Sequence, residues 1–159
     1  MSFDQWILAL HVLSAFAYVA AMIVFWVLIV AVRRTDTADG TIRMAPIVKV
    51  GTIGTGAGAV GTIVFGLWLT FSYGGYNIWD FWIIAALVLW AIAGGLGGQT
   101  GKEYQRGMDK AKELEAAGQA GPNAELLEIN RTQRGLVLHT VASLAVLLIV
   151  IDMIWKPGA

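Results

Sequence analysis

The sequence contains no cysteine, only three prolines and little charge. Without cysteine, disulfide bonds, thiolate metal sites and cysteine nucleophiles are excluded. Lysine and arginine together number 11, as do aspartate and glutamate, so no excess of positive charge predicts nucleic-acid binding. Charged residues make up 14% of the chain, hydrophobic residues make up 57%, and the mean hydropathy is +0.68. This composition is typical of a small polytopic membrane protein.

Four long apolar runs interrupt the polar parts of the chain. A helix needs about 20 mainly apolar residues to cross the hydrocarbon core, and a helix satisfies its own backbone hydrogen bonds in lipid. We therefore expect an all-α fold, a bundle of four transmembrane helices that forms a single membrane domain over residues 1–159. The expected spans cover about 4–32, 49–73, 78–101 and 135–155.

The polar connection at residues 102–134 is expected to be a cytoplasmic loop. Its first part, KEYQRGMDKAKELEAAG, has a helix-forming composition that could continue the third span into the cytoplasm. GQAGPN then ends that helix with glycine and proline. The segment AELLEINRTQRG then reads as the start of the fourth helix, before the membrane.

The basic residues predict an orientation. Ten of the eleven lysines and arginines lie in residues 33–49 and 102–134, and only Lys156 lies at the opposite end. By the positive-inside rule both basic loops face the cytoplasm and both termini face outside, in a multi-pass protein of the cell's inner (plasma) membrane. Aromatic residues are expected at the outer boundary of the bilayer, namely Trp6, Tyr73, Tyr76, Trp79, Trp82 and Trp155.

Glycines of the second span recur on one helical stripe, at Gly51, Gly54, Gly58 and Gly61. Glycine weakens a helix, so this stripe needs a physical reason. One reason is close helix packing through a GxxxG pair. The other is room for a flat cofactor against Gly54 and Gly58. In the third span Gly94 and Gly98 are four residues apart, and we expect both glycine faces to point into the bundle or at a partner subunit.

Three ionisable side chains lie within the expected spans, at His11, His139 and Asp152. An ionisable group in lipid is costly, and it is by default a candidate for function. His11 lies about 9 Å below the outer boundary and shares a face with Tyr18. Asp152 lies at a comparable depth on an antiparallel helix. A His11–Asp152 hydrogen bond could therefore orient a ligating imidazole, or be purely structural.

The two histidines differ in expected depth by about 15 Å, because His139 lies near the inner boundary. This difference favours separate sites over one haem with two histidine ligands. For each histidine three interpretations stand: cofactor ligation, a structural helix contact, and proton or quinone chemistry.

Two end segments carry a family resemblance. LALHVLSAFAYVAAM resembles the first helix of small four-helix membrane proteins that include the copper-resistance D proteins and the HemJ-type protoporphyrinogen oxidases. IDMIWKPGA resembles the end of their last helix, and the middle looks closest to a further branch of predicted integral membrane proteins. The resemblance implies a four-helix bundle that holds a b-type haem, with His11 as axial ligand. Because the oxidases have a basic residue in the third helix and this third span has none before Lys102, haem binding is better supported than that activity.

The leading hypothesis is a membrane b-type haem protein that moves electrons between a quinone and a partner. Its candidate metal ligands are His11 and His139, and its cofactor surface would add Tyr18, Gly54 and Gly58. The alternative is a non-enzymatic accessory or assembly subunit of a larger membrane complex. A third hypothesis is a small transporter that works as a homo-oligomer. Beyond the lipid bilayer, the sequence does not identify a partner. It also does not decide whether the protein is an enzyme.

Overall fold

The computed structural model describes residues 2–72 and 75–157. Six helices follow in the order α1 (Phe3–Val32), α2 (Ala38–Ile42), α3 (Ala45–Ser72), α4 (Phe81–Ala116), α5 (Ala124–Asn130) and α6 (Gln133–Trp155). The described residues contain no strand, so the all-α prediction is confirmed. Tyr73, expected at the end of the second span and in the aromatic boundary, lies outside the described residues.

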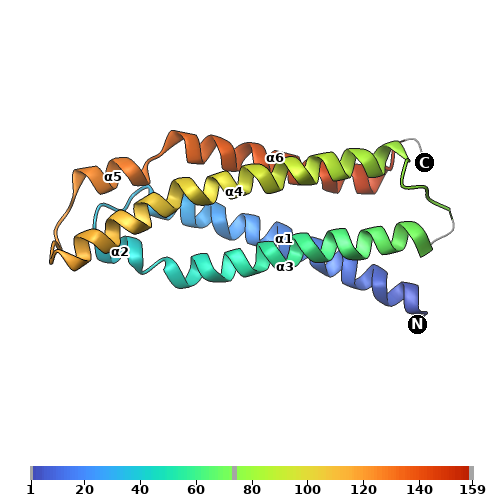
Figure 1. The fold of residues 1–159 in the computed structure, drawn as a ribbon, viewed down its shortest axis with the longest axis horizontal. Helices are drawn as coiled ribbons and strands as arrows, with labels where there is room; N and C mark the ends of the chain where they lie inside the picture. The colour runs from blue at the N-terminus through green and yellow to red at the C-terminus, as the bar shows by residue number, and fades with distance from the viewer. Residues whose placement is uncertain (1, 73–74, 158–159) are drawn as a thin grey trace.

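Four helices are long and apolar enough to cross a membrane, as the sequence predicts. They are α1, α3 together with α2, α4, and α6 together with α5. Figure 1 shows both chain ends at one end of the bundle, which we call the terminal end, and α2 and α5 at the other, which we call the loop end. Helices α1 and α4 run toward the loop end, and α3 and α6 run back.

The helix ends follow from local sequence. Ser2 caps α1 in a capping box with Gln5. Helix α3 begins at Ala45, earlier than expected, and Pro46 falls in its first turn, where a missing N–H leaves no hydrogen bond unmade. Thr132 caps α6, because its hydroxyl oxygen accepts a hydrogen bond from the backbone N–H of Gly135.

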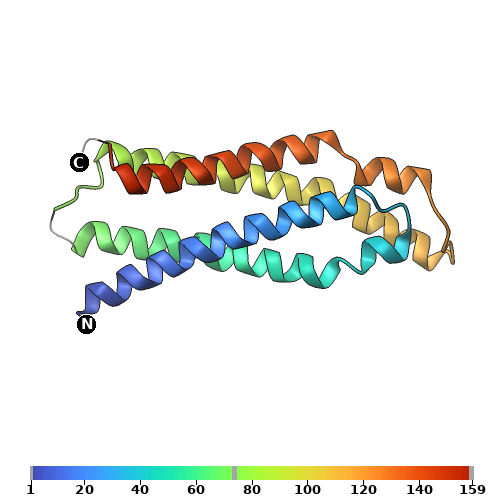
Figure 2. The ribbon, with the colours of Figure 1, turned by 180° about the vertical axis from the view of Figure 1, so that it is seen from behind.

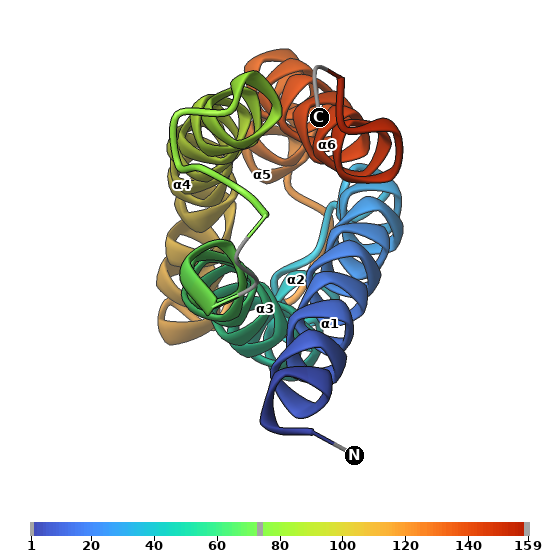
Figure 3. The same cartoon turned by 90° about the vertical axis from the view of Figure 1, so that its right-hand side faces the viewer.

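The bundle consists of two closely packed pairs, α1 with α3 and α4 with α6 (Figure 3). Seen from behind, α1 crosses α3 while α6 runs alongside α4 (Figure 2). A buried cluster joins the pairs near the middle of the bundle, where two side chains of α1 meet small residues of α4 and α6: Tyr18, Met22, Ala93, Ala142, Ala145 and Val146.

The connection at residues 102–134 is mostly helical, and its first part is a helix as its composition predicts. Helix α4 continues well past residue 101 to Ala116, and α5 is separate from α6. The last turns of α4 pack with α2 and α5 around Ala38, Ala111, Leu114 and Leu126. We call α2, residues 102–116 of α4 and α5 the cap, because they form a compact unit at the loop end.

A buried side-chain amide fastens the cap to the end of α1. Asn130 is 1% exposed. Its Nδ2 donates to the carbonyl oxygen of Thr35 at 3.0 Å and to Oγ1 of Thr41 at 3.1 Å. Gly107 leaves the space that the Asn130 amide occupies, since a Cβ at that position would collide with Oδ1. The cap therefore connects both polar segments of the chain through specific hydrogen bonds.

Aromatic residues mark the terminal end. Trp6, Trp79 and Trp155 are exposed there, as expected for side chains at a membrane boundary. Trp82 differs from this expectation because it is buried, with its ring 5.3 Å from that of Tyr76. Packing among the helix ends and the connecting segment explains its burial.

Candidate functional site

The imidazole of His11 lies between α1 and α3. Its Nδ1 is 3.0 Å from the carbonyl oxygen of Thr62. A carbonyl oxygen only accepts, so Nδ1 carries the hydrogen and donates it. The neutral ring then has its lone pair on Nε2.

A glycine on α3 makes room for this ring. A Cβ at position 66 would lie 2.9 Å from Cε1 and 3.1 Å from Nδ1 of His11, so Gly66 permits the observed approach. A hydrogen bond from Nδ1–H to a backbone carbonyl is the usual support of an imidazole that binds a metal through Nε2. His11 is therefore oriented as an imidazole that binds a metal through Nε2 would be.

The predicted hydrogen bond between His11 and Asp152 does not form. His11 uses the carbonyl of Thr62 instead, and Oδ2 of Asp152 is buried with no hydrogen-bond partner among the described residues. The acceptor is a backbone oxygen, so no side-chain type in the sequence points to it. The one sequence feature that could have indicated this contact is Gly66, which lies four residues after Thr62 on α3.

His139 lies on α6 and is 3% exposed. Its ring meets that of Trp26 edge-on at 4.9 Å between centroids, and that of Phe25 at 6.4 Å. Nε2 has no hydrogen-bond partner in the described part of the chain. Trp26 donates from Nε1 to the hydroxyl of Ser143, which itself donates to the carbonyl oxygen of His139. His139 thus belongs to an aromatic contact between α1 and α6.

The two histidines lie at different levels of the bundle. His11 is level with Gly66, whereas His139 is level with Trp26, and 15 residues of α1 at about 1.5 Å each place these levels about 22 Å apart. This separation agrees with the expectation that one iron does not bind both rings.

Helix α1 covers the surface expected to hold a flat cofactor. A Cβ at Gly58 would lie 2.6 Å from the backbone nitrogen of Tyr18, and one at Gly54 would lie 3.4 Å from Cβ of Ala21. Tyr18 is itself buried in the core. Tyr18, Gly54 and Gly58 therefore form a helix contact rather than a cofactor surface, and close packing explains the glycine stripe.

Glycines of α4 face away from the bundle. A Cβ at Gly94 or Gly98 would have no heavy atom within 4 Å, and both residues are exposed. The expectation that they point into the bundle is wrong, because α4 packs on α6 through other residues such as Ala93. The alternative, a partner subunit, stays a prediction.

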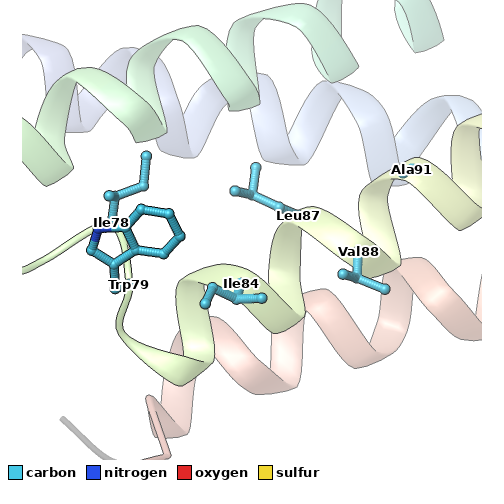
Figure 4. Close-up of a pocket in the computed structure, with 6 residues that line it drawn as sticks. All are labelled: Ile78, Trp79, Ile84, Leu87, Val88 and Ala91. Carbon is cyan, nitrogen blue, oxygen red and sulfur yellow. The ribbon is translucent and has the colours of Figure 1, made fainter.

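An apolar hollow lies at the terminal half of α4 (Figure 4). It has a volume of about 380 Å³. Its lining comes from α4 and the segment before it, and consists of Ile78, Trp79, Ile84, Leu87, Val88 and Ala91. No lining side chain is ionisable, so the hollow suits a hydrocarbon chain.

Residues 2–72 and 75–157 contain no group of three or more histidine, cysteine, aspartate or glutamate side chains that could hold a bare metal ion. A haem iron needs only one or two protein ligands, because the porphyrin supplies four nitrogens. The orientation of His11 fits one such ligand, and the packed surface at Gly58 does not fit a porphyrin face.

Charged residues of the cap form specific pairs. Nζ of Lys110 lies 3.0 Å from a carboxylate oxygen of Glu125 and 3.1 Å from one of Glu113. These hydrogen bonds, first that to Glu125, raise the pKa of Lys110 above its ordinary value. The lysine therefore stays charged and holds α5 against α4.

Comparison with known proteins places this chain in a family. Neither curated proteins nor solved structures give a match. A family model described as "Predicted integral membrane protein (DUF2269)" matches residues 5–157, which is nearly the whole chain. The resemblance to copper-resistance D proteins and HemJ-type oxidases stays a prediction. The chain belongs to the DUF2269 family of predicted integral membrane proteins.

Proposed function

We propose that this protein binds a b-type haem in the membrane through Nε2 of His11. The observation that carries the proposal is the hydrogen bond from Nδ1 of His11 to the carbonyl of Thr62, which leaves Nε2 as the ligating nitrogen. Gly66 keeps the ring in this position by leaving space beside it. His139 lies at another level, and its packing against Trp26 favours a structural role.

The proposed orientation follows from the charges. Ten of the eleven cations lie at the loop end, so the cap faces the cytoplasm and both termini face outside, in the plasma membrane. His11 then lies in the outer half of the bilayer, as does the apolar hollow beside Trp79. That hollow suits the isoprenoid chain of a quinone.

A haem held by His11 would supply one-electron redox chemistry, which fits a carrier between a membrane quinone and a partner protein. The residues of this chain would orient the imidazole through Thr62 and exclude water through the apolar helices around it. His11 would be the one ligand that this chain supplies to the haem.

A reduced-minus-oxidised optical spectrum of the purified protein tests the proposal. With haem supplied during expression, we expect sharp Soret and α bands at near-stoichiometric intensity. His11→Ala should lose these bands, and His139→Phe, which keeps an aromatic ring beside Trp26, should retain them. Bands that persist in His11→Ala, or a flat spectrum from folded wild-type protein, would refute the assignment.

The outward glycine face of α4 favours a second function. In this function the protein is an accessory subunit of a larger membrane complex. Small exposed residues let the backbone of another helix approach closely. Gly94→Leu should then abolish co-purification of a stoichiometric partner without unfolding the chain. A colourless protein that purifies alone would contradict both functions.

A further inference from the structure

A small pocket at the terminal end contains a carboxylate. It has a volume of about 240 Å³ and lies between α4 and the end of α6. Most of its lining is apolar, and one ionisable residue contributes to it: Leu89, Leu148, Ile151, Asp152, Trp155 and Pro157. The pocket is separate from the hollow beside Trp79.

The carboxylate of Asp152 lacks a partner. Its Oδ2 is buried and accepts no hydrogen bond from any described residue. Buried polar atoms are nearly always hydrogen-bonded, and an unpaired charge next to lipid is especially costly. Because no described residue donates to Oδ2 and Asp152 lines the pocket, a donor that enters from the pocket would be the partner that this carboxylate lacks.

The nearest cation is held elsewhere. Lys156 follows Asp152 by four residues, a spacing at which helical side chains pair. The helix ends at Trp155, however, and Lys156 adopts a left-handed φ of 42°. Its Nζ donates to the hydroxyl of Tyr76 at 2.7 Å and lies 5.4 Å from the ring centroid of Trp82. All other lysines and arginines of the chain belong to residues 33–134.

We propose that Asp152 binds the ammonium group of an aminophospholipid headgroup. The carboxylate complements the positive charge and accepts its N–H hydrogens, and the exposed indole of Trp155 offers a face for the same cation. Asp152 lies one helical turn before the end of α6, which is the depth at which lipid headgroups meet a membrane helix. Phosphatidylethanolamine carries such a group, and phosphatidylglycerol does not.

Native mass spectrometry of delipidated protein tests the proposal, with each lipid added separately in detergent. Wild-type protein should retain phosphatidylethanolamine about tenfold better than phosphatidylglycerol, the effect of one charge-assisted hydrogen bond. Phosphatidylcholine, whose quaternary ammonium has no N–H to donate, should be retained less well than phosphatidylethanolamine. Asp152→Asn should lose the preference. The matched control Asp4→Asn, which removes another carboxylate at the terminal end, should keep it.

Each contrary result is decisive. Equal retention of both lipids by the wild type, or an unchanged preference in Asp152→Asn, overturns the proposal. Stabilisation by millimolar free ethanolamine that equals the effect of the lipid assigns the pocket to a soluble amine and overturns the lipid assignment. If Asp152→Asn does not fold, Trp155→Leu decides, since it should weaken retention of phosphatidylethanolamine several-fold while leaving that of phosphatidylglycerol unchanged. An unaltered preference in Trp155→Leu would then count against the site.

Discussion

His11 donates its one N–H to the carbonyl oxygen of Thr62, whereas His139 lies edge-on to Trp26 with Nε2 unpartnered among the described residues. These two environments separate two histidines that look alike in the sequence. A fixed tautomer prepares one nitrogen of His11 for a ligand. The ring of His139 is buried and instead packs edge-on against Trp26 and Phe25.

The tautomer of His11 is a prediction at the residue scale. Nitrogen NMR of ¹⁵N-histidine-labelled protein without haem should show His11 as the neutral ring protonated on Nδ1. Gly66→Ala should disturb this signal, because the added Cβ would lie 2.9 Å from Cε1 and push the ring away from Thr62. His139→Phe removes the other histidine signal and assigns the first. Protonation on Nε2 in the wild type would contradict the hydrogen bond described above.

The glycines of helix α3 let it pack closely against α1. Residues Gly51, Gly54, Gly58 and Gly66 all face side chains or backbone of α1. The glycines in the membrane-spanning part of α4, such as Gly94 and Gly98, face open space instead. Identical residue types therefore serve internal packing in one helix and leave an exposed face in the other.

A pair of matched substitutions tests this difference at the scale of the element. Gly58→Ala places a Cβ 2.6 Å from the backbone of Tyr18, and the overpacking should destabilise the protein by about 1–3 kcal/mol. Gly98→Ala meets no neighbour and should be neutral, or stabilise α4 by up to about 1 kcal/mol. Reversible unfolding in detergent measures both. Equal effects of the two substitutions would refute the packing difference.

The attachment of α5 to α4 should depend on pH. The pKa of Lys110 is raised above its ordinary value of 10.5 by hydrogen bonds to Glu125 and Glu113. A raised pKa means that the folded state binds the proton more tightly, so this contribution is complete below pH 10.5 and is lost as the pH rises through the raised value.

A spin label at Glu128→Cys, on the exposed side of α5, reports this change. Its mobility should rise only in strongly alkaline buffer. In a Lys110→Met background the label should be more mobile already at pH 8, with no further alkaline transition. The same alkaline transition with and without Lys110 would exclude the lysine as its cause.

At the scale of the whole molecule, two helix pairs are joined by a core in the middle and by the cap at the loop end. Arg33 contributes to this junction, since its guanidinium donates to the carbonyl oxygens of Arg131 and Thr132. Ten of the eleven lysines and arginines lie at this loop end, within the cap or in the segments next to it. By the positive-inside rule, this concentration of lysine and arginine near the span ends supports the proposed orientation.

Single cysteines test the orientation directly, because the chain has none of its own. Ser72→Cys lies at the terminal end, and Gln119→Cys lies between α4 and α5. In intact cells a membrane-impermeant maleimide should label Ser72→Cys only, and both cysteines after permeabilisation. The opposite pattern would place the cap outside the cell.

The sequence by itself determined the four spans and the shared position of both chain ends. Apolar runs of this length have one way to satisfy their backbone hydrogen bonds in lipid, and that is local helix formation. The helix-forming composition of residues 102–116 also predicted that the third span continues as a helix beyond the membrane. These properties depend on residues that are close together in the chain, so the sequence alone predicts them.

Only the tertiary structure decided which helix faces meet. Lipid is as apolar as the bundle core, so hydrophobicity does not show which side of a span faces inward. The partner of His11 is a backbone oxygen on α3 rather than Asp152, and α1 fills the space beside Gly58. The cap likewise depends on Asn130 reaching Thr35 and Thr41, far away in the sequence. Such contacts arise from the fit between distant surfaces, which local patterns do not encode.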